Sequence, residues 1–423
     1  MCLGLPPRDA LTHGPRVPVR TECWLPSCAG RGVRLVHGHD RPQAGRSRAG
    51  ALVLMLVLAV ACSATGTAGP PSSASGASTA TPDAGAGSSA SSPTSGPPGT
   101  RPSTRPSTPV TNPVGGSGVP VTSPATTPAD VTAITISVDA PGVGALTFDA
   151  LAAGDPAVAT QGRLVLLLHG FPETDESYRD LLPAVARAGY YAVAFNQRGY
   201  SPRARPPAVE DYVLSALVSD VMLVAQHFGA PTFHVVGHDW GGAVAWVTAA
   251  AHPDAVRTLT ALSTPHPDAL SEAMAHPDDP QSKASGYMQT FRAPGSEDRL
   301  LADGRRSFLG IFGPGAGLPP DKAEAYADVL ATPPALGAAL NWYRATPLPS
   351  PMRVGPVSAP TLYVFGAADG AFAVSTAQAT AAHVTGPYRY VELAGLGHWL
   401  PETAAPAILQ ALLPHLAGTD PAR

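Results

Sequence analysis

The chain has 423 residues, and 27 Lys and Arg side chains stand against 31 Asp and Glu, a formal net charge of −4. This balance excludes a generally basic nucleic-acid-binding protein. Gly (43) and Pro (48) are more frequent than in an average globular protein, so we expect a disordered segment beside a folded domain. All cysteines lie within residues 1–62, so the rest of the chain uses no disulfide, thiolate metal site or cysteine nucleophile.

The first 62 residues have the features of a bacterial export signal. Residues 1–50 contain eight arginines and three acidic residues, and an apolar run at 51–61 follows. The run is shorter than the roughly 20 residues that span a bilayer, and it ends in small residues, which predicts a secretory signal peptide. Leu58-Ala-Val-Ala-Cys62 resembles a lipobox, whose cysteine is lipidated. We expect a lipoprotein anchored at Cys62 to the outer face of the cytoplasmic membrane, or, with a plain cleaved signal, a secreted protein.

Residues 63–130 consist almost entirely of Ser, Thr, Pro, Gly and Ala, with no aromatic residue and no Leu or Ile. Such a segment cannot bury enough apolar surface to offset the entropy lost on ordering. We therefore expect a disordered linker at 63–130 and a folded domain at 131–423.

Strand and helix patterns alternate from residue 131 onward. Alternating and continuous apolar runs predict strands at 134–138, 145–148, 164–168, 191–195, 233–236, 256–262, 361–365 and 389–392. Helical patterns are found near 176–189, 211–228, 241–252, 373–384 and 402–416. This alternation predicts an α/β fold, a mainly parallel sheet flanked by helices. Residues of about 265–350 look helical and interrupt the alternation after the sixth strand, which predicts a cap above the strand ends where ligands bind.

A glycine-rich turn follows the strand at 233–236 directly and opens the next helix. Its sequence, Gly237-His-Asp239-Trp-Gly241-Gly242, has the small-x-nucleophile-x-small pattern of a nucleophile elbow with Asp239 at its centre. A carboxylate attacks carbonyl groups poorly, but it can displace a leaving group from a saturated carbon and form an alkyl ester. The alternative interpretation is that Asp239 only caps the helix.

The loop His169-Gly-Phe171-Pro172 ends the buried strand at 164–168. Beside a nucleophile elbow, a loop in this place supplies the second backbone donor of an oxyanion hole. We expect the N–H groups of Phe171 and Trp240 to stabilise the charge that develops when water attacks the ester. The residues expected to line the substrate pocket are His169, Pro172, Trp240 and Trp399.

The general base is expected among three late histidines, His383, His398 and His415. His398 lies in a flexible loop after the strand at 389–392, whereas the other two lie in predicted helices, so we predict His398 as the base. Asp369 follows the strand at 361–365 and is the expected orienting acid; Asp268 is the second candidate.

Residues 131–420 resemble the α/β-hydrolase superfamily, and specifically its epoxide hydrolases with an Asp nucleophile. The motifs His169-Gly-Phe-Pro-Glu173, Arg198-Gly-Tyr200, the Asp-centred elbow, Asp369 and His398-Trp399 follow the order of that family. Two departures are Asn196, where the family commonly has Asp, and the segment that starts at Ser201.

Two segments of the cap also resemble that family. Tyr287-Met-Gln-Thr-Phe-Arg-Ala-Pro294 and Leu340-Asn-Trp-Tyr343-Arg344 are similar to the segments that carry its epoxide-activating tyrosines. The resemblance implies that Tyr287 and Tyr343 donate hydrogen bonds to the epoxide oxygen and protonate it.

The resemblance implies hydrolysis of a small apolar epoxide to a vicinal diol. An Asp239 alkyl ester would form and would then be hydrolysed by water that His398 and Asp369 activate. One alternative is a haloalkane or haloacid dehalogenase, in which the indole N–H of Trp240 would bind the halide. Another is a non-catalytic surface lipoprotein that binds an apolar ligand. The sequence contains no metal-ligand cluster and no phosphate-binding glycine loop, so we expect no metal and no cofactor, and it specifies no oligomeric state.

Overall fold

The computed structural model describes residues 130–346, 348–350 and 353–419. The predicted leader, Cys62 and the predicted linker up to residue 129 lie outside these residues. Within the described part of the chain, no helix is long and apolar enough to cross a membrane.

Eight strands form one sheet in the order β1-β2-β4-β3-β5-β6-β7-β8. The pairs β1–β2 and β2–β4 are antiparallel, and every pair from β4 to β8 is parallel. This arrangement confirms the predicted mainly parallel sheet. The bounds of the strands are β1 Thr132–Ala140, β2 Gly144–Ala153, β3 Leu164–Leu168, β4 Tyr191–Phe195, β5 Phe233–His238, β6 Val256–Leu262, β7 Thr361–Gly366 and β8 Tyr388–Leu393.

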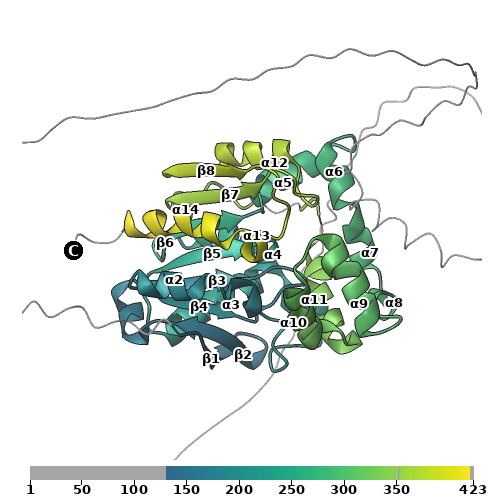
Figure 1. Ribbon diagram of the computed structural model, residues 1–423, viewed down its shortest axis with the longest axis horizontal. Coiled ribbons are helices and arrows are strands. Elements are labelled where there is room, and N and C mark those ends of the chain that lie inside the picture. The colour runs from purple at the N-terminus through teal and green to yellow at the C-terminus, as the bar shows by residue number, and fades with distance from the viewer. Residues whose placement is uncertain (1–129, 347, 351–352, 420–423) are drawn as a thin grey trace, which may run out of the picture. The chain divides into compact units, whose positions relative to one another are not determined.

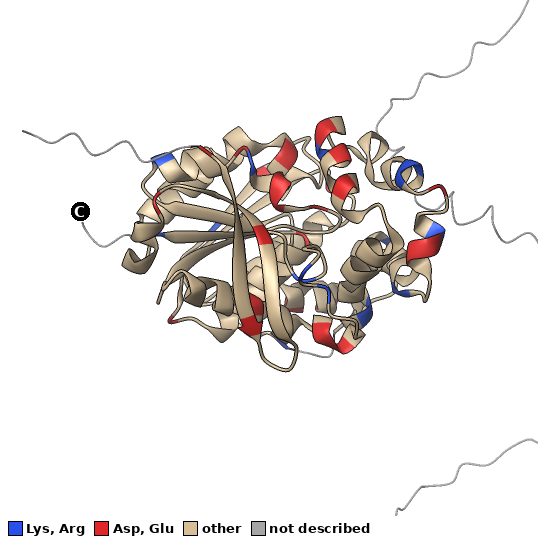
Figure 2. Ribbon diagram, turned by 90° about the horizontal axis from the view of Figure 1, so that it is seen from below, with Lys and Arg blue, Asp and Glu red and all other residues tan. Residues whose placement is uncertain are grey.

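The central strands are apolar because both of their faces are covered. In β3, Leu164, Leu166 and Leu168 belong to one core cluster, whereas Val165 and Leu167 belong to the cluster on the opposite face. Side chains of a strand alternate between the two faces, so a strand covered on both sides needs apolar residues at every position. Figure 2 shows the charged residues mainly on helices and loops, with few on the strands.

Helices cover the sheet on both faces. Apolar residues of α3 (Leu214–His227) and α4 (Trp240–Ala251) join the first core cluster. Residues of α2 (Leu182–Arg187) and α14 (Ala405–Ala417) join the second. The shorter helices α12 (Val374–Ala379) and α13 (Leu400–Thr403) follow β7 and β8 in the chain.

The segment between β6 and β7 is helical, as predicted for the cap. Figure 1 shows its later helices gathered beside one end of the sheet. The bounds of its helices are α5 Pro267–Met274, α6 Pro280–Ala284, α7 Met288–Arg292, α8 Ser296–Leu300, α9 Arg305–Phe312, α10 Pro320–Leu330 and α11 Pro333–Ala345.

Several predicted helices are divided in the structure. The helix expected near 176–189 consists of a 3-10 turn at Asp175–Tyr178 and then α2, with Pro183 in the first turn of α2. The helix expected at 402–416 divides at Ala404, and Pro406 lies in the first turn of α14. Proline fits the first turn of a helix, so both prolines stand where a new helix begins, although α14 also continues through Pro414. Four further 3-10 turns lie at Pro156–Gln161, Val209–Tyr212, Ser285–Tyr287 and Pro314–Ala316, and another at Thr380–His383 follows α12.

Candidate active site

Asp239 lies at a sharp turn between β5 and α4. Its backbone dihedral angles are φ 48° and ψ −121°, a region that residues other than glycine rarely adopt. Holding such a conformation costs about 1–3 kcal/mol, so the surrounding packing must enforce it. Asp239 stands at the N-cap position of α4, yet its side chain makes no capping hydrogen bond. The interpretation of Asp239 as a helix cap is therefore not supported by the geometry.

The glycines around Asp239 are required by close backbone contacts. A Cβ atom on Gly237 would lie 2.2 Å from the carbonyl oxygen of Gly241, and one on Gly241 would lie 2.0 Å from that of Leu168. A Cβ atom on Gly242 would lie 2.7 Å from the Cβ atom of Thr264. Any side chain at these positions would force the turn apart, so the packing of the turn depends on all three glycines.

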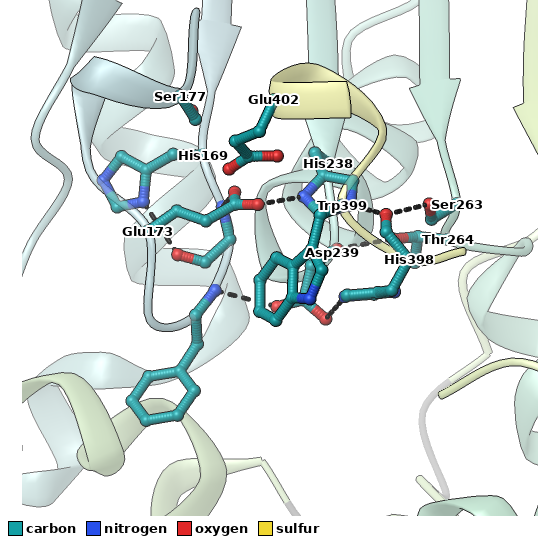
Figure 3. Close-up of polar contacts among 12 residues, drawn as sticks. His169, Glu173, Ser177, His238, Asp239, Ser263, Thr264, His398, Trp399 and Glu402 are labelled. Atoms are coloured by element: carbon teal, nitrogen blue, oxygen red, sulfur yellow. Dashed lines mark hydrogen bonds and ion pairs between the residues drawn. The ribbon is translucent and has the colours of Figure 1, made fainter. Parts of the chain in front are cut away.

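The carboxylate of Asp239 faces the loop after β3. The backbone N–H of Phe171 donates to Asp239 Oδ1 at 2.9 Å (Figure 3). Trp240, the other expected donor, is the first residue of α4, where backbone N–H groups have no partner within the helix. The N–H of Phe171 therefore already contacts the carboxylate of Asp239. Trp240, which carries the second expected donor, directly follows Asp239 in the chain.

His398 lies between two carboxylates. Its Nε2 atom is 3.6 Å from Asp239 Oδ2, and its Nδ1 atom is 2.9 Å from Asp369 Oδ2. The other oxygen of Asp369 accepts hydrogen bonds from the backbone N–H groups of Ala371 and Phe372. Asp369 is thus held in place by its own loop, and it orients the imidazole so that Nε2 faces Asp239.

The charges of this group shift its pKa values. Burial alone lowers the pKa of His398, but the negative charges of Asp369 and Asp239 outweigh burial and raise it well above its ordinary value. Burial alone raises the pKa of Asp239, but hydrogen bonding and charge attraction from His398, together with the Phe171 N–H, leave it below its ordinary value. The resting site therefore holds an ionised Asp239 beside a protonated His398.

Two cap tyrosines lie near the carboxylate. Tyr343 is 2% exposed, and its ring packs edge-on against that of Trp240 with 5.0 Å between centroids. The ring centroid of Tyr287 lies 6.5 Å from that of Tyr343. Burial, and then the nearby charge of Asp239, raises the pKa of both phenols, so both are protonated donors.

An apolar pocket opens beside Asp239. Its empty space, including the open mouth, is about 600 Å³. Trp240 lines it, whereas three other residues predicted to do so, His169, Pro172 and Trp399, are not among its lining residues. The remaining walls come from α3, α4, the cap, the segment before β7 and the loop after β7, through Leu214, Ala243, Leu270, Met288, Leu348, Val354 and Phe372.

His169 and Trp399 are used for packing around the site. The Nδ1 atom of His169 is 2.9 Å from the carbonyl of Gly170, and its Nε2 accepts from the N–H of Gln197. Desolvation lowers the pKa of His169 to about 4, so this ring is neutral. Trp399 packs against His398 and donates its indole N–H to the carbonyl of Ala316. Both residues stabilise the loops that carry the site.

A buried acid–imidazole group lies behind the elbow. Glu173 Oε1 is 2.6 Å from His238 Nδ1, and both side chains are fully buried. The Nε2 atom of His238 faces the carbonyl of His398 at 2.8 Å, and a carbonyl only accepts, so this nitrogen carries a proton. Burial and the charge of Glu173 raise the pKa of Glu402 well above its ordinary value, so Glu402 stays neutral beside it.

The alternative base and acid candidates lie elsewhere. Asp268 accepts hydrogen bonds from the backbone of Val354 and Gly355, and the ring of His383 stacks on that of His266. His415 faces the carbonyl of Leu259 at 3.1 Å. The structure therefore places His398, with its partner Asp369, beside Asp239. His383, His415 and Asp268 have other partners.

One group among the described residues has ligand atoms close enough to hold a metal ion: His266, Asp268 and His383. However, both oxygens of Asp268 accept backbone hydrogen bonds, and His266 uses Nδ1 for the N–H of Asp268 and Nε2 for the carbonyl of Gly355. The two histidine rings are parallel, with an angle of 8° between them, so no single ion lies in both ring planes. These residues hold the segment at 353–355 against α5.

Three residues that contact the site were not found from the sequence. Ser263 Oγ donates to the carbonyl of His398 at 2.9 Å, and Thr264 Oγ1 donates to that of Asp239 at 2.8 Å. His238 contacts the same carbonyl of His398. One signal was available, because Ser263 and Thr264 directly follow a buried strand at the edge of the sheet where the expected site residues gather.

Comparison with known proteins places this architecture in a family context. A family model described as alpha/beta hydrolase fold matches residues 163–405. Epoxide hydrolase A of Mycobacterium tuberculosis (strain ATCC 25618 / H37Rv) is 31% identical over 308 residues, which cover 63% of this chain and 93% of that protein. Epoxide hydrolase 4 of Homo sapiens is 32% identical over 266 residues, covering 60% and 71%. The crystal structure of Epoxide Hydrolase A from Mycobacterium thermoresistibile matches with a TM-score of 0.58 at 28% identity, covering 68% of this chain and 99% of that one.

Proposed function

We propose, from the premise that this chain belongs to the α/β-hydrolase fold family and is an epoxide hydrolase-like enzyme of it, that it hydrolyses small apolar epoxides to vicinal diols. The apolar walls of the pocket favour a substrate with an apolar body, because they offer few polar partners. The names of the relatives support the reaction class, and the geometry around Asp239 supports the route.

In the first step, Asp239 attacks a carbon of the epoxide. A bond forms between a carboxylate oxygen and that carbon, and the bond from this carbon to the ring oxygen breaks. The electron pair stays on the ring oxygen, which takes a proton from Tyr287 or Tyr343. Two protonated phenols near the carboxylate, a buried one on Tyr343 and a half-buried one on Tyr287, suit this role, since an alkoxide is a poor leaving group without a proton donor.

In the second step, water hydrolyses the ester. Once Asp239 is an ester, one of the two charges that raise the pKa of His398 is gone, so the imidazole releases its proton, which restores the tyrosine. Neutral His398 then takes a proton from water as the water oxygen attacks the ester carbonyl. The Phe171 N–H, with that of Trp240, stabilises the oxyanion. Collapse expels the diol oxygen, which takes the proton from His398, and the carboxyl proton of Asp239 returns to the imidazole.

One observation carries this proposal: a carboxylate at the elbow contacts Phe171 N–H on one oxygen and faces His398 on the other. In the first step, the nucleophile needs a carboxylate oxygen that is free to attack the substrate. In the second step, the ester carbonyl needs the Phe171 N–H as a hydrogen-bond donor. The same two contacts therefore serve the two steps in turn.

The test is a single turnover of an epoxide with excess enzyme in oxygen-18 water. The product oxygen first comes from Asp239, so the diol should be largely unlabelled and the label should enter the Asp239 carboxylate. His398→Gln should still form the ester and then stall, which intact-protein mass spectrometry detects as a mass increase. A labelled diol with an unlabelled Asp239 would falsify the nucleophile assignment, and a complete lack of epoxide turnover would favour a non-catalytic ligand-binding protein.

The structure offers less support for a dehalogenase. A halide leaves without a proton donor, whereas here two protonated phenols, Tyr287 and Tyr343, lie near Asp239. Haloalkanes tested as substrates in the same single-turnover assay distinguish the two reactions, because a dehalogenase would form the Asp239 ester from them.

A further inference from the structure

The end of β6 has an unusual backbone. Ser263, directly after the strand, has φ 62°, and within the described residues Asp239 is the other non-glycine residue with a positive φ. Such a conformation costs about 1–3 kcal/mol and persists where surrounding contacts enforce it. Strained residues cluster at functional sites, so the role of Ser263 needs an explanation.

The surrounding contacts hold both residues of the turn. Ser263 is fully buried and Thr264 is 2% exposed. The Ser263 N–H donates to the carbonyl of Val364, and its carbonyl accepts from the hydroxyl of Tyr363, each at 2.9 Å. The carbonyl of Thr264 accepts the indole N–H of Trp246 at 3.0 Å. The backbone of the pair is therefore anchored to β7 and α4.

The two hydroxyls reach two different loops. Ser263 Oγ donates to the backbone carbonyl of His398, and Thr264 Oγ1 donates to that of Asp239 (Figure 3). His398 and Asp239 are far apart in the sequence, and neighbouring residues of one rigid turn hold both of their backbones.

We propose that Ser263 and Thr264 form a positioning clamp that sets the distance between the general base His398 and the nucleophile Asp239. This inference rests on the proposed function for the roles of the two held residues. The clamp residues touch neither substrate nor reacting atoms. They act through the backbones of Asp239 and His398.

The clamp matters because the distance that it controls is critical. His398 Nε2 lies 3.6 Å from Asp239 Oδ2, just beyond hydrogen-bonding distance, which leaves little tolerance for displacement. The carbonyl of His398 also accepts from His238 Nε2 and the N–H of Leu400, so removal of Ser263 Oγ alone should loosen the loop without releasing it. Thr264 packs against the elbow at Gly242 as well.

The first test compares Ser263→Ala with Ser263→Gly in single-turnover experiments with an epoxide. Both remove the hydroxyl, but glycine also relieves the strain at φ 62°. We expect both variants to slow ester hydrolysis on the order of tenfold, since a 1 Å misplacement can cost about 100-fold. The rate of ester formation should change less, because His398 acts as a base only in the second step. An equal loss in both steps, or a normal Ser263→Gly enzyme, overturns the proposal.

Thr264 provides a second test with a matched control. Thr264→Val should slow ester formation about tenfold, because it frees the backbone of the nucleophile, and Thr264→Ser should restore the rate. Thr248→Val removes an equally buried hydroxyl that donates to Val244 within α4, at 2.8 Å. The clamp is refuted if Thr264→Ser fails to rescue, or if Thr248→Val reproduces the loss.

A third measurement needs no substrate. The pKa of the His398 imidazole, followed by NMR in the full chain, should fall in Ser263→Ala and Ser263→Gly, since the ring moves away from the charge of Asp239. An unchanged pKa of His398 in both variants overturns the clamp. If no epoxide forms an ester on wild-type Asp239, the proposed function fails, and this measurement still decides on the clamp.

Discussion

At the scale of single residues, the site depends on one imidazole between two carboxylates. Asp369 is fully buried and anchored by two backbone N–H groups, so its charge is fixed in position. Asp239 is also ionised, but its charge disappears when it becomes an ester. The base strength of His398 is thus controlled by the state of the nucleophile, and the pKa of the imidazole falls when water is to be activated.

The cap tyrosines should be required for ring opening. Tyr287→Phe and Tyr343→Phe should each slow ester formation, and the double variant should nearly abolish it, since loss of one charge-stabilising donor typically costs on the order of 10²–10³ in rate. Stopped-flow or quenched single-turnover assays measure this step directly. Tyr326→Phe, a cap tyrosine whose hydroxyl contacts Glu402, serves as the control. Wild-type ester formation by the double variant would exclude the epoxide mechanism, and retained haloalkane turnover would then favour the dehalogenase.

The two chemical steps should differ in pH dependence. Ester hydrolysis needs neutral His398, so its rate should rise with pH through the pKa of the imidazole in the ester. Ester formation needs ionised Asp239, whose pKa is lowered, so its rate should stay flat over the same range and fall only in acid. Single-turnover rates between about pH 5 and 9 test this, because an imidazole titrates there. Parallel profiles for the two steps would contradict the assignment of His398.

The contribution of His398 to stability should change with pH in the opposite direction to the rate of ester hydrolysis. The pKa of His398 is raised in the folded state, so its contribution to the free energy of unfolding is full below the unfolded pKa of about 6.5. That contribution is lost as pH rises through the folded pKa. In His398→Gln, the stability difference from wild type should therefore shrink as pH increases.

At the scale of elements, Arg198 connects the sheet domain to the cap, and a buried ion pair holds its side chain in place. Arg198 donates two hydrogen bonds to Asp220 on α3, and both side chains are 2% exposed. Arg198 also donates to the carbonyl of Asp211, and its own carbonyl accepts the indole N–H of Trp342 on α11. Arg198, which follows β4, thus connects α3 with the cap.

Asp220→Ala should destabilise the fold strongly. It leaves the buried guanidinium of Arg198 without its anion, which typically costs about 3–5 kcal/mol. The exposed pair Arg203–Asp149 is the matched control, and Arg203→Ala should cost about 1 kcal/mol or less. Urea denaturation of both variants measures the difference. Equal costs for the two would show that burial of the Arg198 pair does not matter.

At the scale of the whole molecule, the described domain carries the proposed chemistry, and we propose that the preceding residues determine where the protein is located. The described residues begin at 130, and the basic leader, the apolar run and Cys62 come before them. We propose, from the sequence alone, that the chain is exported and lipidated at Cys62. The linker at 63–130 would then hold the hydrolase domain away from the membrane surface.

Cys62→Ala should release the protein from membranes. In a bacterial host the wild-type chain should fractionate with membranes and carry a lipid mass on the peptide that begins at Cys62, whereas the variant should not. Cys28→Ala, in the same leader, is the control and should behave as wild type. A wild-type protein with an unmodified Cys62, or membrane association that survives Cys62→Ala, would exclude a lipid anchor.

The sequence by itself determined the α/β class, the order of the strands along the chain and the place of the cap. It did so because strands buried on both faces are continuously apolar and helices repeat every 3.6 residues, and both patterns are local. The strand-to-helix turn with its glycines singled out Asp239 for the same reason.

The tertiary structure decided which distant groups meet. It placed His398 between Asp239 and Asp369 and kept Asp268 and His383 away from that place. It also left His169, Pro172 and Trp399 out of the pocket wall. It also brought Ser263 and Thr264 to the backbones of His398 and Asp239. These contacts join residues from separate strand ends, and their distances follow from the register and packing of the sheet, which no local pattern encodes.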